Sequence, residues 1–199
     1  IQQMSENEIL NSLGKMYIGT IHAYCLQLLK DSYDFGNWDM LDEVSQLVYV
    51  RKYAGDLRFF LDKKHFQRDY KANISIQDRP KKFLQSYEIL YNEELDLQKV
   101  EKERPKFIEK IKILEDYFKK DRVLTFGQLI KLAIENLEKN RNPVKDLKYL
   151  FVDEYQDVNK AQVHLVRLLG EDIPSLGKRT QIFVVGDPKQ SIYHWRGSS

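Results

Sequence analysis

The chain of 199 residues contains a single cysteine, Cys25, so it can form neither an internal disulfide nor a zinc site built from several cysteines. No segment approaches the ~18 consecutive apolar residues that a membrane-spanning helix needs. We find no signal peptide, internal repeat or low-complexity tract. These absences predict a reducing compartment, the cytoplasm, and a protein with no membrane partner.

The sequence also lacks the pattern G-x-x-x-x-G-K-[ST], the loop whose backbone amides and lysine hold the phosphates of a nucleotide. Its first residue is Ile1 rather than a methionine. We therefore expect Ile1 to be a cut or processed end. The chain is expected to be a fragment of a longer protein or the product of a degenerate gene.

Charge is balanced over the whole chain but not along it. The formal net charge of +2 favours no class of partner. Residues 51–82, however, carry ten Lys/Arg against four Asp/Glu, whereas residues 83–103 carry six acidic residues against two lysines. This pattern predicts a basic face and an acidic face on neighbouring elements.

The amino-terminal part of the chain predicts a helix, a strand and a second helix. Apolar residues at helical spacing indicate a short helix at 2–13. The run M-Y-I-G-T-I at 16–21 indicates a strand that leads into an apolar helix at 22–29, with Thr20 as its capping residue.

Residues 38–140 are predicted to be mostly helical, because apolar residues recur there at helical spacing. Asp39 is a capping candidate for the first of these helices, and the pattern ends at 140–143. Later helices are expected to begin at Pro80, Pro105 and Thr125.

The pattern changes near the carboxyl end. Continuous apolar runs at 149–152 and 181–185 fit short parallel strands that are buried on both faces. A helical segment at 160–169 separates them, which predicts a βαβ unit.

The predicted organisation is of the α/β class and discontinuous. A parallel-sheet domain contributes residues 1–24 and 146–199. A helical insertion at 25–145 leaves that domain and re-enters it.

The strongest functional signal is the acidic pair Asp153 and Glu154 within residues 150–157, L-F-V-D-E-Y-Q-D. Ligands of open α/β sheets bind at the carboxyl ends of the strands. A carboxylate there can hold Mg²⁺ together with phosphates, and a second one can orient and deprotonate an attacking water. For an acidic pair alone, a solvated loop after a strand is an equally good interpretation.

The second signal is residues 185–197, V-G-D-P-K-Q-S-I-Y-H-W-R-G, at the end of the second apolar run. Gln190 can both donate and accept, so it could detect a terminal phosphate or its water. Trp195 offers a flat face for base stacking, and Arg196 can pair with a phosphate or with Glu154. Taken alone, a buried tryptophan and a surface arginine are the simpler interpretation.

The third signal is G-T-I-H at residues 19–22, at the expected turn from strand to helix. Thr20 and His22 could touch a nucleic-acid backbone there. A helix cap and a structural histidine are the alternative, and they are favoured for this segment by itself.

Together, these segments resemble the UvrD/Rep/PcrA-type helicases of superfamily 1. Residues 19–25 are similar to that family's T-F-H-S-type motif, residues 150–157 to its Walker B motif, and residues 185–197 to the motif that couples ATP to DNA. Residues 124–129 resemble its D-F-D-D-L stretch without the acids, and residues 40–43 resemble a segment early in its helical insertion, domain 1B. The resemblance spans nearly the whole chain, and the middle matches by layout more than by residues.

The resemblance implies a partial RecA-like parallel sheet, domain 1A, with a large all-helical insertion, domain 1B. It implies ATP and Mg²⁺ as cofactors, with Asp153 as the metal ligand and Glu154 as the residue that activates water. Further implied roles are detection of the γ-phosphate by Gln190, base stacking by Trp195 and coupling of the nucleotide by Arg196.

Three more residues are implied to lie on or near the path of a single strand: Thr20, His22 and Tyr193. The sequence departs from the family at Pro188 and Lys189, which replace an acidic or small pair. The charge of this loop is therefore unusual for the family.

The implied function of the complete protein is an ATP-dependent helicase that moves 3′ to 5′ along single-stranded DNA and unwinds duplex DNA in repair or recombination. We hypothesise that the basic face of residues 51–82 meets that duplex, although amphipathic helices expose lysines in any case. Expected partners are DNA, the missing lobes of the same polypeptide and other repair or recombination proteins. The rival hypothesis is a non-catalytic DNA-binding or scaffold protein that kept the fold and lost the phosphate loop.

Because these residues include no phosphate-binding loop, the purified 199-residue chain should not turn over ATP. The measurement is release of phosphate with and without single-stranded DNA. Hydrolysis that DNA stimulates would contradict this expectation.

Overall fold

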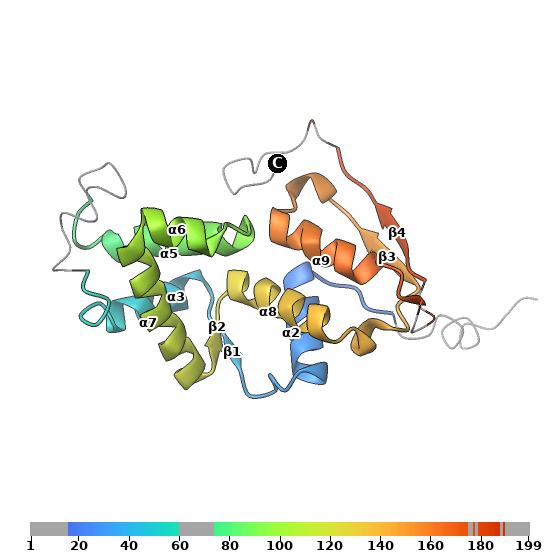
Figure 1. Cartoon of the computed structure of the whole chain (residues 1–199), viewed down its shortest axis with the longest axis horizontal. Helices are drawn as coiled ribbons and strands as arrows, with labels where there is room; N and C mark the ends of the chain where they lie inside the picture. Colours follow the sequence, from blue (N-terminus) through green and yellow to red (C-terminus); the bar gives the residue numbers. More distant parts are fainter. Residues whose placement is uncertain (1–15, 60–73, 175–176, 178, 188, 190–199) are drawn as a thin grey trace, which may run out of the picture.

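The computed structural model describes residues 16–59, 74–174, 177, 179–187 and 189. These residues form two groups of helices side by side, with a two-stranded parallel sheet at one edge (Figure 1). Within the described part, no helix is both long and apolar enough to cross a membrane. The helix predicted at 2–13 lies outside the described residues.

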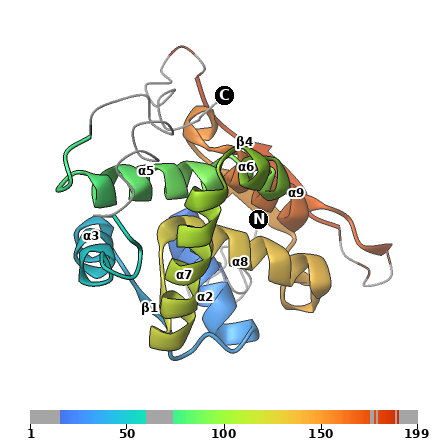
Figure 2. The ribbon, with the colours of Figure 1, turned by 60° about the vertical axis from the view of Figure 1, so that its left-hand side comes forward.

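The first group contains α3 (Glu43–Lys52), α5 (Arg79–Asn92), α6 (Leu97–Glu103) and α7 (Pro105–Asp121). Proline lies in the first turn of both α5 and α7, where a missing N–H donor is tolerated, as predicted. Figure 2 shows α3 and α5 on one side of the molecule, α9 on the other, and α7 between them. The largest fully buried side chains of their common core are Phe59, Phe83, Tyr87 and Phe118.

The start of α3 differs from the prediction. Asp42, and not Asp39, caps the helix, because its Oδ1 accepts the backbone N–H of Ser45 at 2.7 Å. Asp39 lies in β1 (Asp39–Met40), which pairs in parallel with β2 (Val123–Leu124). The backbone of Asp39 is therefore held in an extended ladder and cannot begin a helix.

The second group contains α2 (Ile21–Ser32), α8 (Phe126–Lys139) and α9 (Lys160–Gly170), which share a second apolar core. Each helix begins after a residue whose side-chain oxygen accepts a backbone N–H of the first turn. These capping residues are Thr20, Thr125 and Asn159. The predicted cap at Thr20 and the predicted helix start at Thr125 are confirmed.

The strand predicted at 16–21 is not present in the structure. The backbone of residues 16–20 is irregular, and Ile21 already belongs to α2. Among the described residues, the strands pair only as β1 with β2 and β3 with β4, so this apolar run has no strand to join. Ile18 is accordingly 84% exposed.

β3 (Tyr149–Val152) and β4 (Gln181–Val184) confirm the predicted βαβ unit. The two strands pair in parallel over their full length, and α9 lies between them in the sequence. A short 3₁₀ turn, η1 (Asn142–Val144), leads from α8 towards β3. Leu150 of β3 packs against the second core, which α9 shares.

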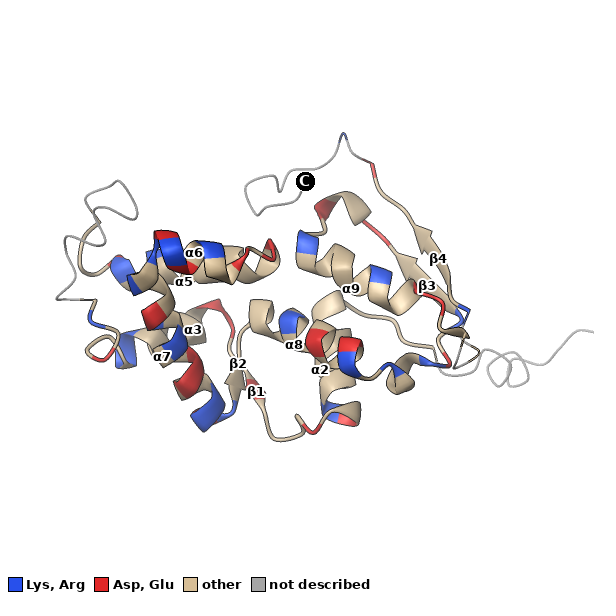
Figure 3. Ribbon diagram, in the orientation of Figure 1, with Lys and Arg blue, Asp and Glu red and all other residues tan. Residues whose placement is uncertain are grey.

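The prediction that both faces of these strands are buried is wrong. Successive side chains of a strand point to opposite faces, and α9 lies on only one side of β3 and β4 (Figure 1). On the other face Phe151 is 72% exposed, and its ring stacks on that of Phe183 with 4.8 Å between centroids. Neither strand carries a charged residue, whereas charged positions are frequent on the helices (Figure 3).

The described strands thus form two short parallel sheets of two strands each. A mixed class of helices and parallel strands is confirmed. The complete RecA-like sheet stays a prediction, as does the division into a sheet domain at 1–24 and 146–199 with an insertion at 25–145.

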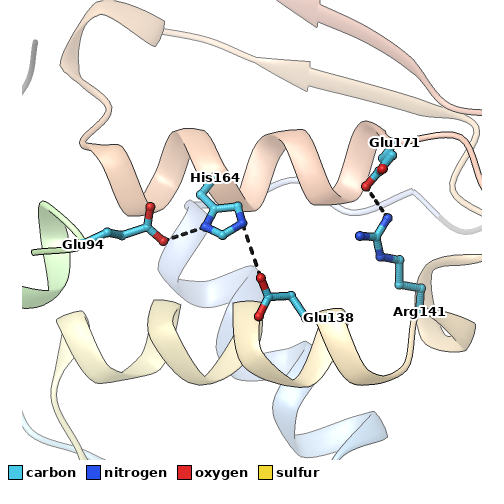
Figure 4. Close-up of polar contacts among 5 residues, drawn as sticks. All are labelled: Glu94, Glu138, Arg141, His164 and Glu171. Atoms are coloured by element: carbon cyan, nitrogen blue, oxygen red, sulfur yellow. Dashed lines mark hydrogen bonds and ion pairs between the residues drawn. The ribbon is translucent and has the colours of Figure 1, made fainter. Parts of the chain in front are cut away.

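The turn between α5 and α6 connects the first helix group to α9. Glu93 Oε2 lies 3.1 Å from Lys160 Nζ, and Glu94 Oε1 lies 2.6 Å from His164 Nδ1. The other ring nitrogen of His164 lies 3.6 Å from Glu138 Oε1 of α8 (Figure 4). Two neighbouring acidic residues therefore meet two residues one helical turn apart on α9. The ion pair of Glu93 with Lys160 and the contacts of the His164 ring add to the apolar packing between the groups.

Loss of the Lys160 ammonium should destabilise the chain, because the Glu93 side chain is only 11% exposed and its Oε1 is enclosed without a hydrogen-bond partner among the described residues. Lys160→Met should lower the free energy of unfolding in urea by about 1 kcal/mol. Lys112→Met is the matched control, because the side chains of its pair with Glu101 are 66% and 50% exposed. That control should change stability by less than about 0.5 kcal/mol, and equal losses in both variants would contradict the role of burial.

Candidate functional site at the ends of two parallel strands

The acidic pair lies where β3 ends, as the sequence predicts. Glu154 has a left-handed backbone conformation, with φ of 52°, at the start of the 3₁₀ turn η2 (Tyr155–Asp157). Its N–H donates to Asp153 Oδ1 at 2.9 Å. Both side chains are exposed, so their carboxylates are accessible at the edge where parallel strands bind ligands.

The backbones that leave β3 and β4 stay joined beyond the strands. The N–H of Val185 donates to the carbonyl of Val152 at 2.9 Å, and the N–H of Tyr155 donates to the carbonyl of Val185 at 2.8 Å. The loop after β4, in which Gly186 and Asp187 follow Val185, therefore starts beside the acidic pair.

Gln156 completes this junction, although sequence reasoning assigned it no role. Its side chain contacts both Glu154 and the backbone of Asp187. The sequence feature that could have indicated a role for Gln156 is its position, two residues after Glu154 in the Walker B-like segment. Nothing in that segment indicated that its amide would contact the loop after β4.

A magnesium ion fits this strand end by the chemistry of its ligands. Mg²⁺ in nucleotide sites is held by one or two carboxylates together with phosphates and water. Asp153 provides an exposed carboxylate at the exit of β3, and Asp157 Oδ1 is enclosed without a hydrogen-bond partner among the described residues. The described residues contain no group of three or more His, Cys, Asp or Glu that could hold a metal. Asp153 would therefore need the phosphates of a nucleotide to complete the site.

Thr20 and His22 lie together at the start of α2. Thr20 Oγ1 accepts the N–H of Ala23 at 3.1 Å, so Thr20 acts as a helix cap. The ring of His22 packs edge-on against Phe126 at the start of α8, with 5.1 Å between centroids. Burial lowers the pKa of His22, so at neutral pH its imidazole would contact a phosphate by hydrogen bonding and not by charge.

The structure does not connect Thr20 and His22 to the acidic pair Asp153 and Glu154. Among the described residues, no hydrogen bond, ion pair or ring contact links Thr20 or His22 to Asp153 or Glu154. The other predicted site residues lie outside the described part of the chain, and their roles stay predictions: Gln190, Tyr193, Trp195 and Arg196.

Parallel strands with paired carboxylates at their exit are typical of α/β domains, a class in which ligands bind at the strand ends. The family model of the UvrD/REP helicase N-terminal domain matches residues 1–199. The chain therefore belongs to the UvrD/REP helicase family.

Curated relatives agree with this family. ATP-dependent DNA helicase Rep of Buchnera aphidicola subsp. Acyrthosiphon pisum is 29% identical over 195 residues, which cover 94% of this chain and 28% of that protein. ATP-dependent DNA helicase PcrA of Bacillus subtilis is 29% identical over 196 residues, which cover 92% of this chain and 24% of the relative. Rep of Escherichia coli is 41% identical over 90 residues, 43% of this chain and 12% of that helicase. The chain thus spans about a quarter of the length of the two relatives that it matches over most of its own length.

Glu88 of α5 lies against the first turn of α8, close to the residue that His22 contacts. Its Oε2 accepts the N–H of Gly127 at 3.1 Å, while its Oε1 is enclosed without a hydrogen-bond partner among the described residues. Desolvation by burial raises the pKa of Glu88 to about 7, and it outweighs the hydrogen bonds from Thr125 and Gly127, which lower the pKa. Sequence reasoning missed this carboxyl, because only the packing of α5 on α8 encloses it.

Glu88 should make the stability of the chain depend on pH. Its folded-state pKa of about 7 lies above the ordinary value of 4.5, so the folded state favours the protonated form. The stability that Glu88 contributes is full below about pH 4.5 and is lost as the pH rises through about 7.

Glu88→Gln keeps an acceptor for Gly127 and carries no charge at any pH. Relative to wild type, the substitution should therefore raise the free energy of unfolding in urea, and this gain should be about 1–3 kcal/mol larger at pH 8 than at pH 5. Glu103→Gln on α6, where Glu103 is exposed, is the control and should show no such difference. Parallel pH profiles for wild type and Glu88→Gln would rule out this role of Glu88.

Proposed function

We propose that this chain is part of the motor of an ATP-dependent DNA helicase, and that the exits of β3 and β4 form its site of ATP hydrolysis. One observation carries the proposal. Two exposed carboxylates, Asp153 and Glu154, leave a parallel strand beside the loop of its neighbour, in a chain of the UvrD/REP helicase family. The relatives that the chain matches are named ATP-dependent DNA helicases, which supports ATP and DNA as its ligands.

Asp153 and Glu154 take different parts in the proposed reaction. Mg²⁺, when bound with ATP, neutralises the charge that develops on the phosphates. Asp153 would hold the ion through its exposed carboxylate. Glu154 orients the attacking water and accepts its proton.

In the complete protein, hydrolysis would drive movement 3′ to 5′ along single-stranded DNA and unwinding of duplex DNA in repair or recombination. Gln190 detects the γ-phosphate, and Arg196 couples the nucleotide to the strand. The residues assigned to the single strand are Thr20, His22, Tyr193 and Trp195.

The cytoplasm is the compartment that we propose for this protein. Cys25 is buried in α2 and is the single cysteine of the sequence. Burial raises the pKa of its thiol to about 12, so Cys25 is a core residue and not a reactive thiol.

Replacing the proposed base should slow hydrolysis without weakening nucleotide binding. The test protein is a longer polypeptide in which a phosphate-binding loop and the second motor lobe accompany this chain. Glu154→Gln should lower kcat for ATP by about 10²–10⁴, while the Kd for ATP stays within about threefold. Glu171→Gln, at an exposed carboxylate just after α9, is the matched control and should leave kcat unchanged.

Normal turnover in Glu154→Gln would show that another group activates the water. Binding of single-stranded DNA without any ATP turnover, even with Glu154 in place, would favour the non-catalytic DNA-binding alternative.

A further inference from the structure

Gln156 joins the exits of the two parallel strands through both ends of its side-chain amide. Its Nε2 donates to Glu154 Oε2 at 2.5 Å, and its Oε1 accepts the backbone N–H of Asp187 at 3.0 Å. A single side chain therefore contacts the proposed base after β3 and the loop that follows β4.

The surroundings of Gln156 leave its amide little freedom. A β-carbon on Gly186 would overlap Gln156 Oε1 and would lie 3.0 Å from the backbone nitrogen of Gln156, so any other residue at 186 would displace the amide. The backbone ladder through Tyr155 and Val185 holds the main chain beside the contact. A shift of Asp187 must then either carry the amide with it or break their hydrogen bond.

An amide is the side chain that satisfies both contacts. The carboxylate of Glu154 only accepts hydrogen bonds and the N–H of Asp187 only donates one, and glutamine offers a matching donor and acceptor at once. A glutamate at position 156 would still accept from Asp187 but would repel Glu154, and a leucine would do neither. Substitutions can therefore separate the two contacts.

We propose that Gln156 is a positioning residue that holds the carboxylate of Glu154 in place relative to the backbone of Asp187, at the start of the loop after β4. This inference rests on the proposed function, in which Glu154 is the base that activates water. An exposed carboxylate can take several orientations, and the hydrogen bond from Gln156 favours one of them for Glu154.

The link itself is tested on the 199-residue chain by amide hydrogen exchange followed by NMR. Gln156→Leu should make the Asp187 amide exchange about two- to tenfold faster, which corresponds to the loss of one intramolecular hydrogen bond. Gln156→Glu keeps an acceptor and should leave that rate within about twofold. Gln85→Leu, at an exposed glutamine of α5, is the matched control. Equal exchange of Asp187 in wild type and Gln156→Leu would overturn the link.

The positioning role is tested by ATPase kinetics in the longer polypeptide. Gln156→Leu and Gln156→Glu both remove the donor to Glu154, so each should lower kcat about tenfold or more, while KM for ATP changes by less than about threefold. In a Glu154→Gln background the same substitutions should cause no further loss, because the residue through which Gln156 acts is already changed. If Gln156 had a merely structural role, its substitution would lower kcat by the same factor in wild type and in the Glu154→Gln background.

The outcomes distinguish the inference from the function on which it rests. If the longer wild-type polypeptide hydrolyses no ATP, the proposed function fails and the catalytic role of Gln156 fails with it, whereas the exchange experiment still decides whether the link exists. If it hydrolyses ATP and the Gln156 variants act independently of Glu154, or have no effect, the function stands and the positioning role is overturned. Thermal melting identifies variants that do not fold, and Gln156→Glu provides the kinetic test should Gln156→Leu unfold.

Discussion

The parallel pairing of β3 and β4 is the constraint on which the rest of the candidate site depends. The backbone ladder continues past both strands, so two loops that lie far apart in the sequence leave the sheet side by side. Asp153 and Glu154 follow the last paired residue of β3, and both side chains are exposed. Gln156 reaches Asp187, 31 residues away, because the same ladder places the start of the second loop beside the first.

The pairing depends in turn on the helices, since two strands alone are at best marginally stable in water. Leu150 of β3 packs into the core that α2, α8 and α9 share. Helix α9 is also held to the turn between α5 and α6 by the ion pair of Lys160 with Glu93 and by the contact of the His164 ring with Glu94. The helices thus support the sheet from one side and leave its other face, with Phe151, open.

Sequence patterns correctly predicted those parts of the fold that depend on interactions between residues close together in the sequence. The apolar runs of β3 and β4 and the capped start of α8 at Thr125 are read from a few neighbouring residues. The errors concern residues for which several local outcomes are equally good. Asp39 and Asp42 can both cap a helix, and pairing with β2, distant in the sequence, decides between them. The run at 16–21 has the composition of a strand, but a strand forms only where a partner offers its backbone.

The sequence by itself determined the family, the βαβ unit and the acidic pair Asp153 and Glu154. Each of these features is encoded in contiguous residues or in short motifs that follow one another in a fixed order. The tertiary structure alone decided which face of the sheet is open and that packing encloses the carboxyl of Glu88. It alone decided that the amide of Gln156 contacts both strand exits. Each of these depends on distances between atoms whose residues are far apart along the chain, and no local periodicity or composition encodes such distances.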